Sequence, residues 1–355
     1  MHKQYPIIDG HQDIAWNKLA LNRDFMESAF VKRVFDHQHD QGVALVGVPE
    51  AERANIRIIF STLWAQSNTS LYPAPGPKYT NFFEAETQID DQLGYYTHLA
   101  KHEKISLITT ASAAEEILNA SQWSLGIILL IENGEAITSP YKVAYWYKRG
   151  VRIIGPAWET NRYIHSDNQD GGVSSEGVEL LRAIQNHGII LDTAHMAETS
   201  FFESLNVYSG CVINTHSNCR SLVPGTRQLS DNMISAISER EGVIGLMPWN
   251  YKIVRDWSIQ HQSNVTLEDF LQHILHICMV TGNTSCVGLG TSFDAGFGSE
   301  STPKEIDTIA DLPLIFDILS LRGFSDEDIH KFAYGNWLRV LKNCLNDRDT
   351  IGNIS

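Results

Sequence analysis

The chain has 355 residues, of which 43% are hydrophobic and 19% charged, a composition typical of globular proteins and unlike that of disordered chains. The chain contains 27 Lys and Arg residues and 42 Asp and Glu residues, which gives a formal net charge of −15. Nucleic acids and anionic membranes are bound through concentrated Lys and Arg, so this balance argues against both as partners. The length allows either two ordinary domains or one large α/β barrel.

The N-terminal sequence contains no apolar stretch of the length that a secretory signal requires. The longest uninterrupted apolar run, at residues 127–131, is too short to cross a membrane. Five cysteines are present without any CxxC pair, and this odd number favours reduced thiols over a disulfide framework. We therefore expect a cytoplasmic protein that does not enter a membrane.

Eight short runs rich in Ile, Val and Leu predict β-strands, at residues 5–8, 56–62, 125–131, 151–155, 189–192, 212–215, 243–247 and 287–290. Most of these runs are continuously apolar, as expected for strands that are covered on both faces. Helical patterns fall between them, at residues 82–102, 174–186, 200–206, 230–240 and 266–281, and the capping sequence at 325–328 predicts a last helix through 341. This alternation predicts an α/β fold with a parallel sheet, and eight repeats predict a (β/α)8 TIM-like barrel.

Three segments do not follow this repeat. Residues 18–49 form an insertion after the first strand, with a short hairpin expected at 43–48. Residues 71–79 contain three prolines and predict a loop, whereas 106–109 predict an accessory strand outside the barrel. Because no interdomain linker, low-complexity tract or repeat is visible, we expect residues 1–355 to form a single barrel domain with an insertion at about 18–49.

Polar side chains follow several of the predicted strands at the point where each strand ends. In a (β/α)8 barrel the chemistry lies at these C-terminal strand ends. The side chains found there include three histidines and several carboxylates, namely His11, Asp13, Glu132, His195, His216 and Asp294. Imidazole and carboxylate ligands suit zinc, and also cobalt or manganese. The pattern therefore predicts a metal site at this rim of the barrel.

Local arguments support this interpretation and leave alternatives open. His11 and Asp13 are two residues apart, so in an extended segment both project to the same side. Glu132 follows five branched apolar residues, where an ionised carboxylate is costly unless it is paired or binds a metal. Taken singly, Glu132 could pair with an arginine, and His195 or His216 could be structural. Their joint occurrence at the ends of separate strands favours one site.

The motifs DGHQD, IENGE, LDTAHM, INTHSNCR and PGTR follow one another along nearly the whole chain. Their order and spacing resemble the membrane (renal) dipeptidase family, peptidase family M19 of the amidohydrolase superfamily. The resemblance is closest to a bacterial branch marked by the sequence Gly-Pro-Ala-Trp, here at 155–158. It implies a zinc metallopeptidase that hydrolyses small dipeptides or similar amides. Since dimers are common in the family, a homodimer is a further expectation.

The resemblance also implies particular roles for individual residues. His11 and Asp13 would hold one zinc ion, His195 and His216 a second, and Glu132 would bridge the two. A bridging hydroxide activated by both metals would attack the scissile amide. Arg227, in the motif after the sixth strand, would bind the carboxylate of the substrate, which suits the forked geometry of a guanidinium group.

The chain departs from the family pattern at two positions. Ser292 stands where the family places the aspartate that moves a proton, and the loss of such a group typically costs about 10²–10⁴-fold in rate. Asp294, two residues further on, is the remaining candidate for this catalytic role. Trp158 stands where mammalian-type members have a substrate-binding histidine, so we expect Trp158 to contact the substrate. Arg162 and His165 are nearby alternatives.

Three hypotheses follow. The first is a binuclear zinc dipeptidase-like amide hydrolase. The second is a catalytically weakened metal-binding homologue, because of Ser292. The third is another barrel metalloenzyme, such as a deaminase or a phosphoesterase. Two features count against the third: Glu132 stands where many relatives have a carboxylated lysine, and Arg227 is the one cation assigned to the rim, whereas a phosphate site prefers several.

Overall fold

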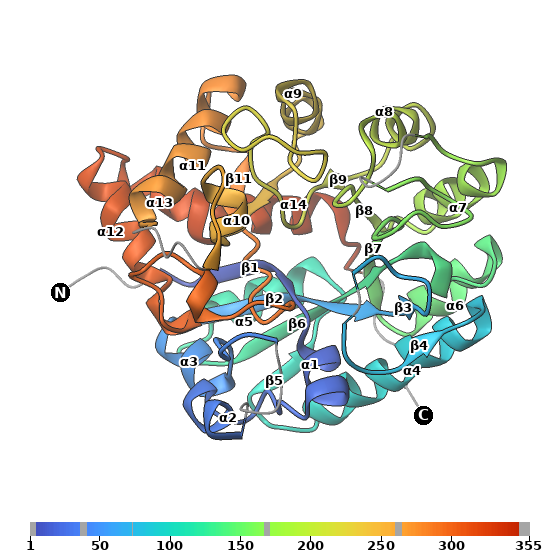
Figure 1. Ribbon diagram of the computed structural model, residues 1–355, viewed down its shortest axis with the longest axis horizontal. Helices are drawn as coiled ribbons and strands as arrows, with labels where there is room; N and C mark the ends of the chain where they lie inside the picture. Colours follow the sequence, from blue (N-terminus) through green and yellow to red (C-terminus); the bar gives the residue numbers. More distant parts are fainter. Residues whose placement is uncertain (1–4, 36–40, 73, 167–170, 260–264, 348–355) are drawn as a thin grey trace.

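The barrel is formed by parallel strands that follow one another around a nearly closed sheet (Figure 1). The computed structural model describes residues 5–35, 41–72, 74–166, 171–259 and 265–347. Around the sheet the strand order is β10-β11-β1-β2-β6-β7-β8-β9. A parallel bridge between Asn214 and Ile244 joins the two ends of this path. The predicted (β/α)8 fold is thus confirmed.

All eight predicted strands are present, most of them with shifted ends. They are β1 (Ile7–Gln12), β2 (Ile56–Trp64), β6 (Leu125–Glu132), β7 (Val151–Gly155), β8 (Ile190–Asp192), β9 (Val212–Ile213), β10 (Ile244–Leu246) and β11 (Val287–Leu289). The predicted accessory strand is β5 (Ile105–Leu107), which pairs with β6 outside the barrel path. Two short strands, β3 (Gln66–Ser67) and β4 (Lys78–Tyr79), pair at the two ends of the proline-rich loop.

Helices surround the strands, and α13 begins at the predicted capping sequence (Figure 1). The side chains of Ser174, Ser230 and Ser325 accept hydrogen bonds from the first turns of α7, α9 and α13. The α-helices are α1 (Ile14–Leu21), α2 (Ala29–Phe35), α3 (Val48–Arg53), α4 (Phe82–Leu99), α5 (Ala111–Asn119), α6 (Val143–Lys148), α7 (Ser175–Asn186), α8 (Glu198–Val207), α9 (Asp231–Glu239), α10 (Asn250–Ile253), α11 (Leu267–Thr281), α12 (Pro313–Leu321), α13 (Asp326–His330) and α14 (Asn336–Cys344). Across the described residues, no helix combines the length and the apolar character that a membrane span needs.

Alternating side chains of the strands fill the inside of the barrel. One buried cluster gathers residues from β1, β2, β6, β7, β8 and β9, including Ile8, Ile128 and Leu130, together with Trp337 of α14. Trp337 closes this cluster, with its ring 5.0 Å from that of Phe60 and its indole N–H donating to the carbonyl of Leu289. Because strand side chains alternate between faces, the residue two places after Leu130 also points inward. The apolar pattern of β6 therefore directs its last side chain, a carboxylate, into the barrel.

Two sequence-based expectations are wrong. The segment 43–48 forms no hairpin, because the backbone N–H groups of Leu45 and Val46 donate to the side chain of Asp294 and α3 begins at Val48. The cysteines are not all reduced, since Cys211 and Cys344 form a disulfide. Their positions, just before β9 and at the end of α14, are 133 residues apart in sequence, but the fold brings their Cα atoms to 6.1 Å. Spacing along the chain could not reveal this proximity.

Candidate active site

The carboxylate of Glu132 lies at the centre of the predicted ligands. Its Oε2 is 3.8 Å from Nε2 of His11, and its Oε1 is 3.3 Å from Nε2 of His195 and 3.6 Å from Nε2 of His216. Asp13 lies on the His11 side, with Oδ2 3.7 Å from the His11 Nε2. The structure thus brings all five predicted ligands together, with the two oxygens of Glu132 facing different histidines.

Buried hydrogen bonds orient these side chains. The hydroxyl of Thr62, which follows Phe60 on the inward face of β2, donates to Oδ1 of Asp13 at 2.5 Å. The Thr215 hydroxyl donates to Asp192 at 2.6 Å, so its oxygen can accept a hydrogen bond from Nδ1 of His216 at 2.9 Å. A histidine protonated on Nδ1 presents the lone pair of Nε2 to a metal. This contact fixes His216 in a ligating tautomer.

The backbone is constrained where the site residues lie. His195 has φ 63° and Ser292 has φ 52°, values that are uncommon for residues other than glycine. The N–H of Ser292 donates to the carbonyl of His11 at 3.1 Å, which ties the end of the last strand to the first ligand. Such conformations persist where the surrounding structure holds them, and they are frequent at functional sites.

Burial shapes the electrostatics of the carboxylate and its nearest histidine. Burial raises the pKa of Glu132 to about 8, although the charge of His11 acts against this rise. Burial alone would lower the pKa of His11, but the carboxylates of Glu132, Asp13 and Asp192 outweigh it and raise that pKa to about 9. The charge of each group acts on the pKa of the other, so the two titrate as a pair. Metal ligands must be deprotonated, so metal binding there competes with the protons of this pair.

The pKa values of the other two histidines are shifted in the opposite direction, downward. Burial, together with the positive charges of Arg227 and His11, keeps the pKa values of His195 and His216 well below the usual range. Both rings are neutral, and their Nε2 atoms lie 3.0 Å apart. Neutral imidazoles are the form that binds a metal. These two rings are thus ready to act as ligands.

The donor set fits a metal centre. His11, Glu132 and His216 present ligand atoms that all lie within 4.8 Å of one another, and all three residues are buried. Oε1 of Glu132 is buried and accepts no hydrogen bond within the described chain, which would leave a costly unsatisfied oxygen unless a cation binds there. Histidine and carboxylate donors suit zinc.

Arg227 lies beside the second pair of histidines. Its guanidinium donates to the Ser217 hydroxyl at 2.7 Å and to the His216 carbonyl at 2.7 Å, and it lies 3.3 Å from Nε2 of His195. These contacts hold the cation at the edge of the cluster, next to the ligands. A guanidinium placed there can bind a carboxylate of a ligand that also reaches the metals.

The two candidates for proton transfer differ in their surroundings. Ser292 is buried beside the first ligand through its contact with His11. Both carboxylate oxygens of Asp294 accept backbone hydrogen bonds, from Leu45 at 2.8 Å and from Val46 at 3.1 Å. A catalytic role for Asp294 stays a prediction, but these contacts favour a role in anchoring the insertion.

We expect Asp294→Asn to destabilise the protein by about 1–3 kcal/mol, because one of the two buried N–H groups would lose its acceptor. Urea unfolding measures this loss. The matched control is Asp307→Asn, which removes an exposed carboxylate paired with Arg33 of the same insertion and should cost less than about 1 kcal/mol. A loss of turnover above 100-fold at unchanged stability would instead place Asp294 in the catalytic machinery.

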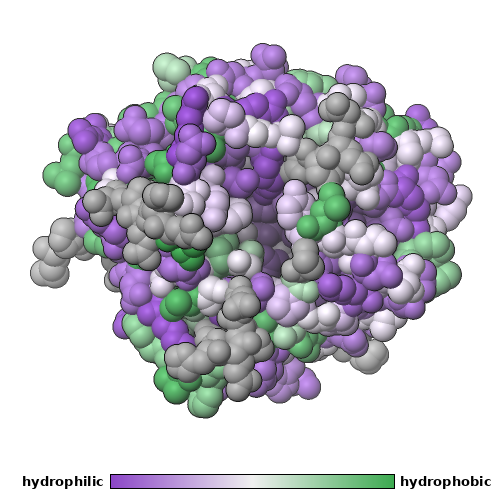
Figure 2. Space-filling model, in the orientation of Figure 1, coloured by the Kyte–Doolittle hydropathy of each residue, from purple (hydrophilic) through white to green (hydrophobic). Residues whose placement is uncertain are grey.

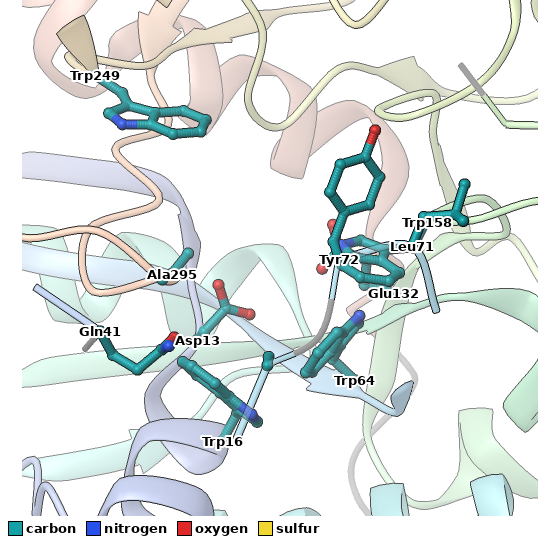
Figure 3. A pocket seen from close by; sticks show the side chains of 12 residues that line it. Asp13, Trp16, Gln41, Trp64, Leu71, Tyr72, Glu132, Trp158, Trp249 and Ala295 are labelled. Carbon is teal, nitrogen blue, oxygen red and sulfur yellow. The ribbon is translucent and has the colours of Figure 1, made fainter. Parts of the chain in front are cut away.

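Aromatic residues form one wall beside the metal ligands (Figure 3). Trp158 lies there as predicted, with its ring 6.2 Å from that of His195. Trp16 and Trp64 also line this wall and were missed by the sequence analysis. Trp64 ends β2, so the rule that strand ends carry function could have found it. Arg162 is engaged elsewhere, in contacts with Glu135 and the carbonyl of Ile137.

Histidines and carboxylates gathered at the C-terminal ends of barrel strands define the class of metal-dependent barrel hydrolases. The family model described as membrane dipeptidase (peptidase family M19) matches residues 1–352, and the chain belongs to this family. The resemblance found in the sequence is therefore confirmed. Homologues named dipeptidases support the assignment of the chain as a metallopeptidase-type enzyme.

The individual relatives have low sequence identity to this chain. An uncharacterised dipeptidase of Schizosaccharomyces pombe is 24% identical over 352 residues, covering 95% of this chain and 80% of that protein. A metallopeptidase of Rhodobacter sphaeroides, solved with a phosphinate mimic of L-Ala-D-Ala, has a TM-score of 0.81 at 20% identity, covering 96% of this chain and all of that one. A probable dipeptidase of Pseudomonas aeruginosa also has a TM-score of 0.81, at 16% identity, covering 98% of this chain and 97% of that one. These likenesses establish the shared fold.

Proposed function

We propose that the protein is a binuclear zinc dipeptidase-like hydrolase that cleaves the amide bond of small dipeptides. One observation carries the proposal: the two oxygens of Glu132 face different histidines, Oε2 toward His11 and Oε1 toward His195 and His216. His11 and Asp13 would hold one zinc ion, and His195 and His216 the other. Zinc bound there would supply Lewis-acid activation of water and of the scissile carbonyl.

The other residues would orient the substrate and move protons. Arg227 would bind the C-terminal carboxylate and thereby fix which amide bond reaches the ligands. Trp158 would cover the site and exclude bulk water, which strengthens electrostatic interactions inside it. Ser292 lies beside His11 but cannot serve as a base at neutral pH. The proton of the attacking water therefore lacks the carboxylate acceptor that the family pattern provides.

The test is metal content together with turnover. Protein reconstituted with zinc should hold about two zinc ions per chain and hydrolyse some members of a panel of L-L and L-D dipeptides. Removing zinc with a chelator should abolish the activity, and adding zinc should restore it. If the loaded protein cleaved none of the panel, the proposed activity would be overturned.

Ser292 favours a second candidate, a homologue that binds metal and substrate but turns over slowly. This candidate predicts full zinc content, ordinary affinity for a carboxylate ligand and a much reduced rate. The two candidates share the metal site and differ only in proton transfer. A cytoplasmic location and a homodimer stay predictions from the sequence.

A further inference from the structure

A cavity of about 400 Å³ opens directly onto the ligands Asp13 and Glu132 (Figure 3). Pockets of about 300–1,000 Å³ are typical of sites for small molecules. The face shown in Figure 2 is also hollowed near its centre. Most of the remaining lining is apolar and includes four tryptophans, with Trp16, Trp64, Trp158, Trp249, Leu71 and Tyr72 as its large side chains. The cavity is therefore part of the proposed active site and is much more apolar than the ligand cluster.

The aromatic rings along one wall contact one another edge to face. The Trp16 and Trp64 rings are 5.9 Å apart at 88°, and the Trp64 and Trp158 rings are 4.8 Å apart at 69°. Tyr72 continues the series, 6.5 Å from Trp158 at 81°. Such pairs favour packing of a further apolar or aromatic group over binding of a strongly hydrated one. The rings form a continuous wall from the metal ligands to the surface.

Tyr72 is 60% exposed, yet the loop that carries it is held in place. Oε1 of Glu159 accepts hydrogen bonds from the Ser70 hydroxyl at 2.8 Å and from the N–H of Leu71 at 2.9 Å. On the other side, Oε1 of Gln66 accepts from the N–H of Ala74 at 3.0 Å. Two polar side chains thus fix an exposed aromatic residue over the cavity. This arrangement suits a substrate contact better than a loose surface loop does.

The charges around the cavity set the orientation of a substrate. Among the described lining residues, only Asp13 and Glu132 are charged, and both are assigned to metal. Arg227 lies outside this lining, against Ser217 and the carbonyl of His216. A dipeptide with its carboxylate at Arg227 and its amide bond at the ligands would direct its N-terminal residue toward the cavity. Apart from these two metal ligands, the described lining offers no charged group that could neutralise a charge on the side chain of that residue.

We propose, on the basis of the function proposed above, that the substrates are dipeptides whose N-terminal residue carries a bulky uncharged side chain, aromatic or branched aliphatic. A cavity of about 150 Å³ suffices for benzene, so a cavity of about 400 Å³ has room for a ring and the peptide backbone. A methyl group would leave most of the aromatic wall in contact with water. A carboxylate or an ammonium group at the end of that side chain would lose hydration without gaining a partner.

The proposal is tested by comparing Phe-Ala, Leu-Ala, Ala-Ala, Glu-Ala and Lys-Ala with the zinc-loaded protein. We expect kcat/KM for Phe-Ala and Leu-Ala to exceed that for Ala-Ala by at least about tenfold, because one methylene in an apolar pocket is worth about 10–200-fold. Tyr72→Ala should reduce this preference. Tyr141→Ala, which removes a tyrosine that is 91% exposed and outside the cavity lining, should leave it unchanged. Glu159→Ala, which removes the acceptor of both hydrogen bonds to the loop, should raise KM for Phe-Ala with little change in kcat, and should leave KM for Ala-Ala unaltered.

A binding measurement separates this inference from the proposed function. Phosphinate mimics of Phe-Ala and Ala-Ala are titrated into the zinc-loaded and metal-free protein, with tryptophan fluorescence as the readout. Tighter binding of the phenyl mimic without hydrolysis of any dipeptide would overturn the hydrolase and retain the cavity preference. Hydrolysis of Ala-Ala at the rate of Phe-Ala, with equal binding of the two mimics, would overturn the preference and retain the hydrolase. A preference for Lys-Ala would also overturn it and show that the aromatic wall selects a cation.

Discussion

Replacing Glu132 by glutamine is expected to remove zinc binding and to lower turnover by at least about a thousandfold. Glutamine fills the same space but offers one neutral oxygen in place of two charged ones, so one of the two ligand sets loses its shared donor. Metal sites depend on the charge of their ligands as well as on their geometry. Metal analysis after dialysis against a weak chelator, together with dipeptide hydrolysis, measures both effects.

Glu135→Gln is the matched control, three residues further along the chain. The Glu135 carboxylate pairs with Arg162 and does not contact the ligand cluster. This variant should keep its zinc and its rate. Full zinc content in the Glu132→Gln protein would contradict the role of Glu132 as the shared ligand. One ion would then be held by His11 and Asp13, and the other by His195 and His216.

Replacing Ser292 by aspartate is expected to raise turnover by about 10²–10⁴-fold, the usual contribution of a positioned acid or base. The backbone there suits the change, since φ is 52° and aspartate tolerates the left-handed region better than most residues. The contact between the Ser292 N–H and the carbonyl of His11 involves backbone atoms alone, so it survives the substitution. The rate constant kcat on a good dipeptide, compared with the wild-type protein, measures the effect.

The variant Ser292→Asn distinguishes the effect of the carboxylate charge from the effect of side-chain size. Asparagine has nearly the same size as aspartate but cannot accept a proton, so this variant should turn over no faster than the wild type. Fast hydrolysis by the wild-type protein, with no gain from aspartate, would instead show that proton transfer proceeds through another group. That result would exclude the catalytically weakened homologue.

The sequence predicted the barrel and the ligand cluster because both depend on local regularities. Continuous apolar runs mark strands that are buried on both faces, and the rule that function lies at strand ends then selects His11, Glu132 and His216. The inward direction of Glu132 follows from the alternation of side chains along β6. Both predictions depend only on residues close together in the chain and on the regular repeat of strands in a (β/α)8 barrel.

Contacts between distant segments could not be predicted in this way. The hairpin expected at 43–48 is replaced by hydrogen bonds from Leu45 and Val46 to Asp294, about 250 residues away in sequence. Tyr72 lies in a proline-rich loop, and its place over the cavity depends on contacts of that loop with Gln66 and Glu159. Neither pairing leaves a periodic signal in the sequence. Only the packed fold defines these partners.

The disulfide between Cys211 and Cys344 has a consequence for the unfolded chain. It closes a covalent ring between two residues 133 positions apart, and this ring contains β9, β10, β11 and every helix from α9 to α14. In the chain-entropy description, a ring of about 100 residues lowers the conformational entropy of the unfolded state. This raises the free energy of unfolding by about 4.7 kcal/mol. Cys211 precedes β9, so the bond lies at the ends of the strands remote from the metal ligands. Three of the eight barrel strands are thus held in one covalent loop, which is closed at the rim opposite the metal ligands.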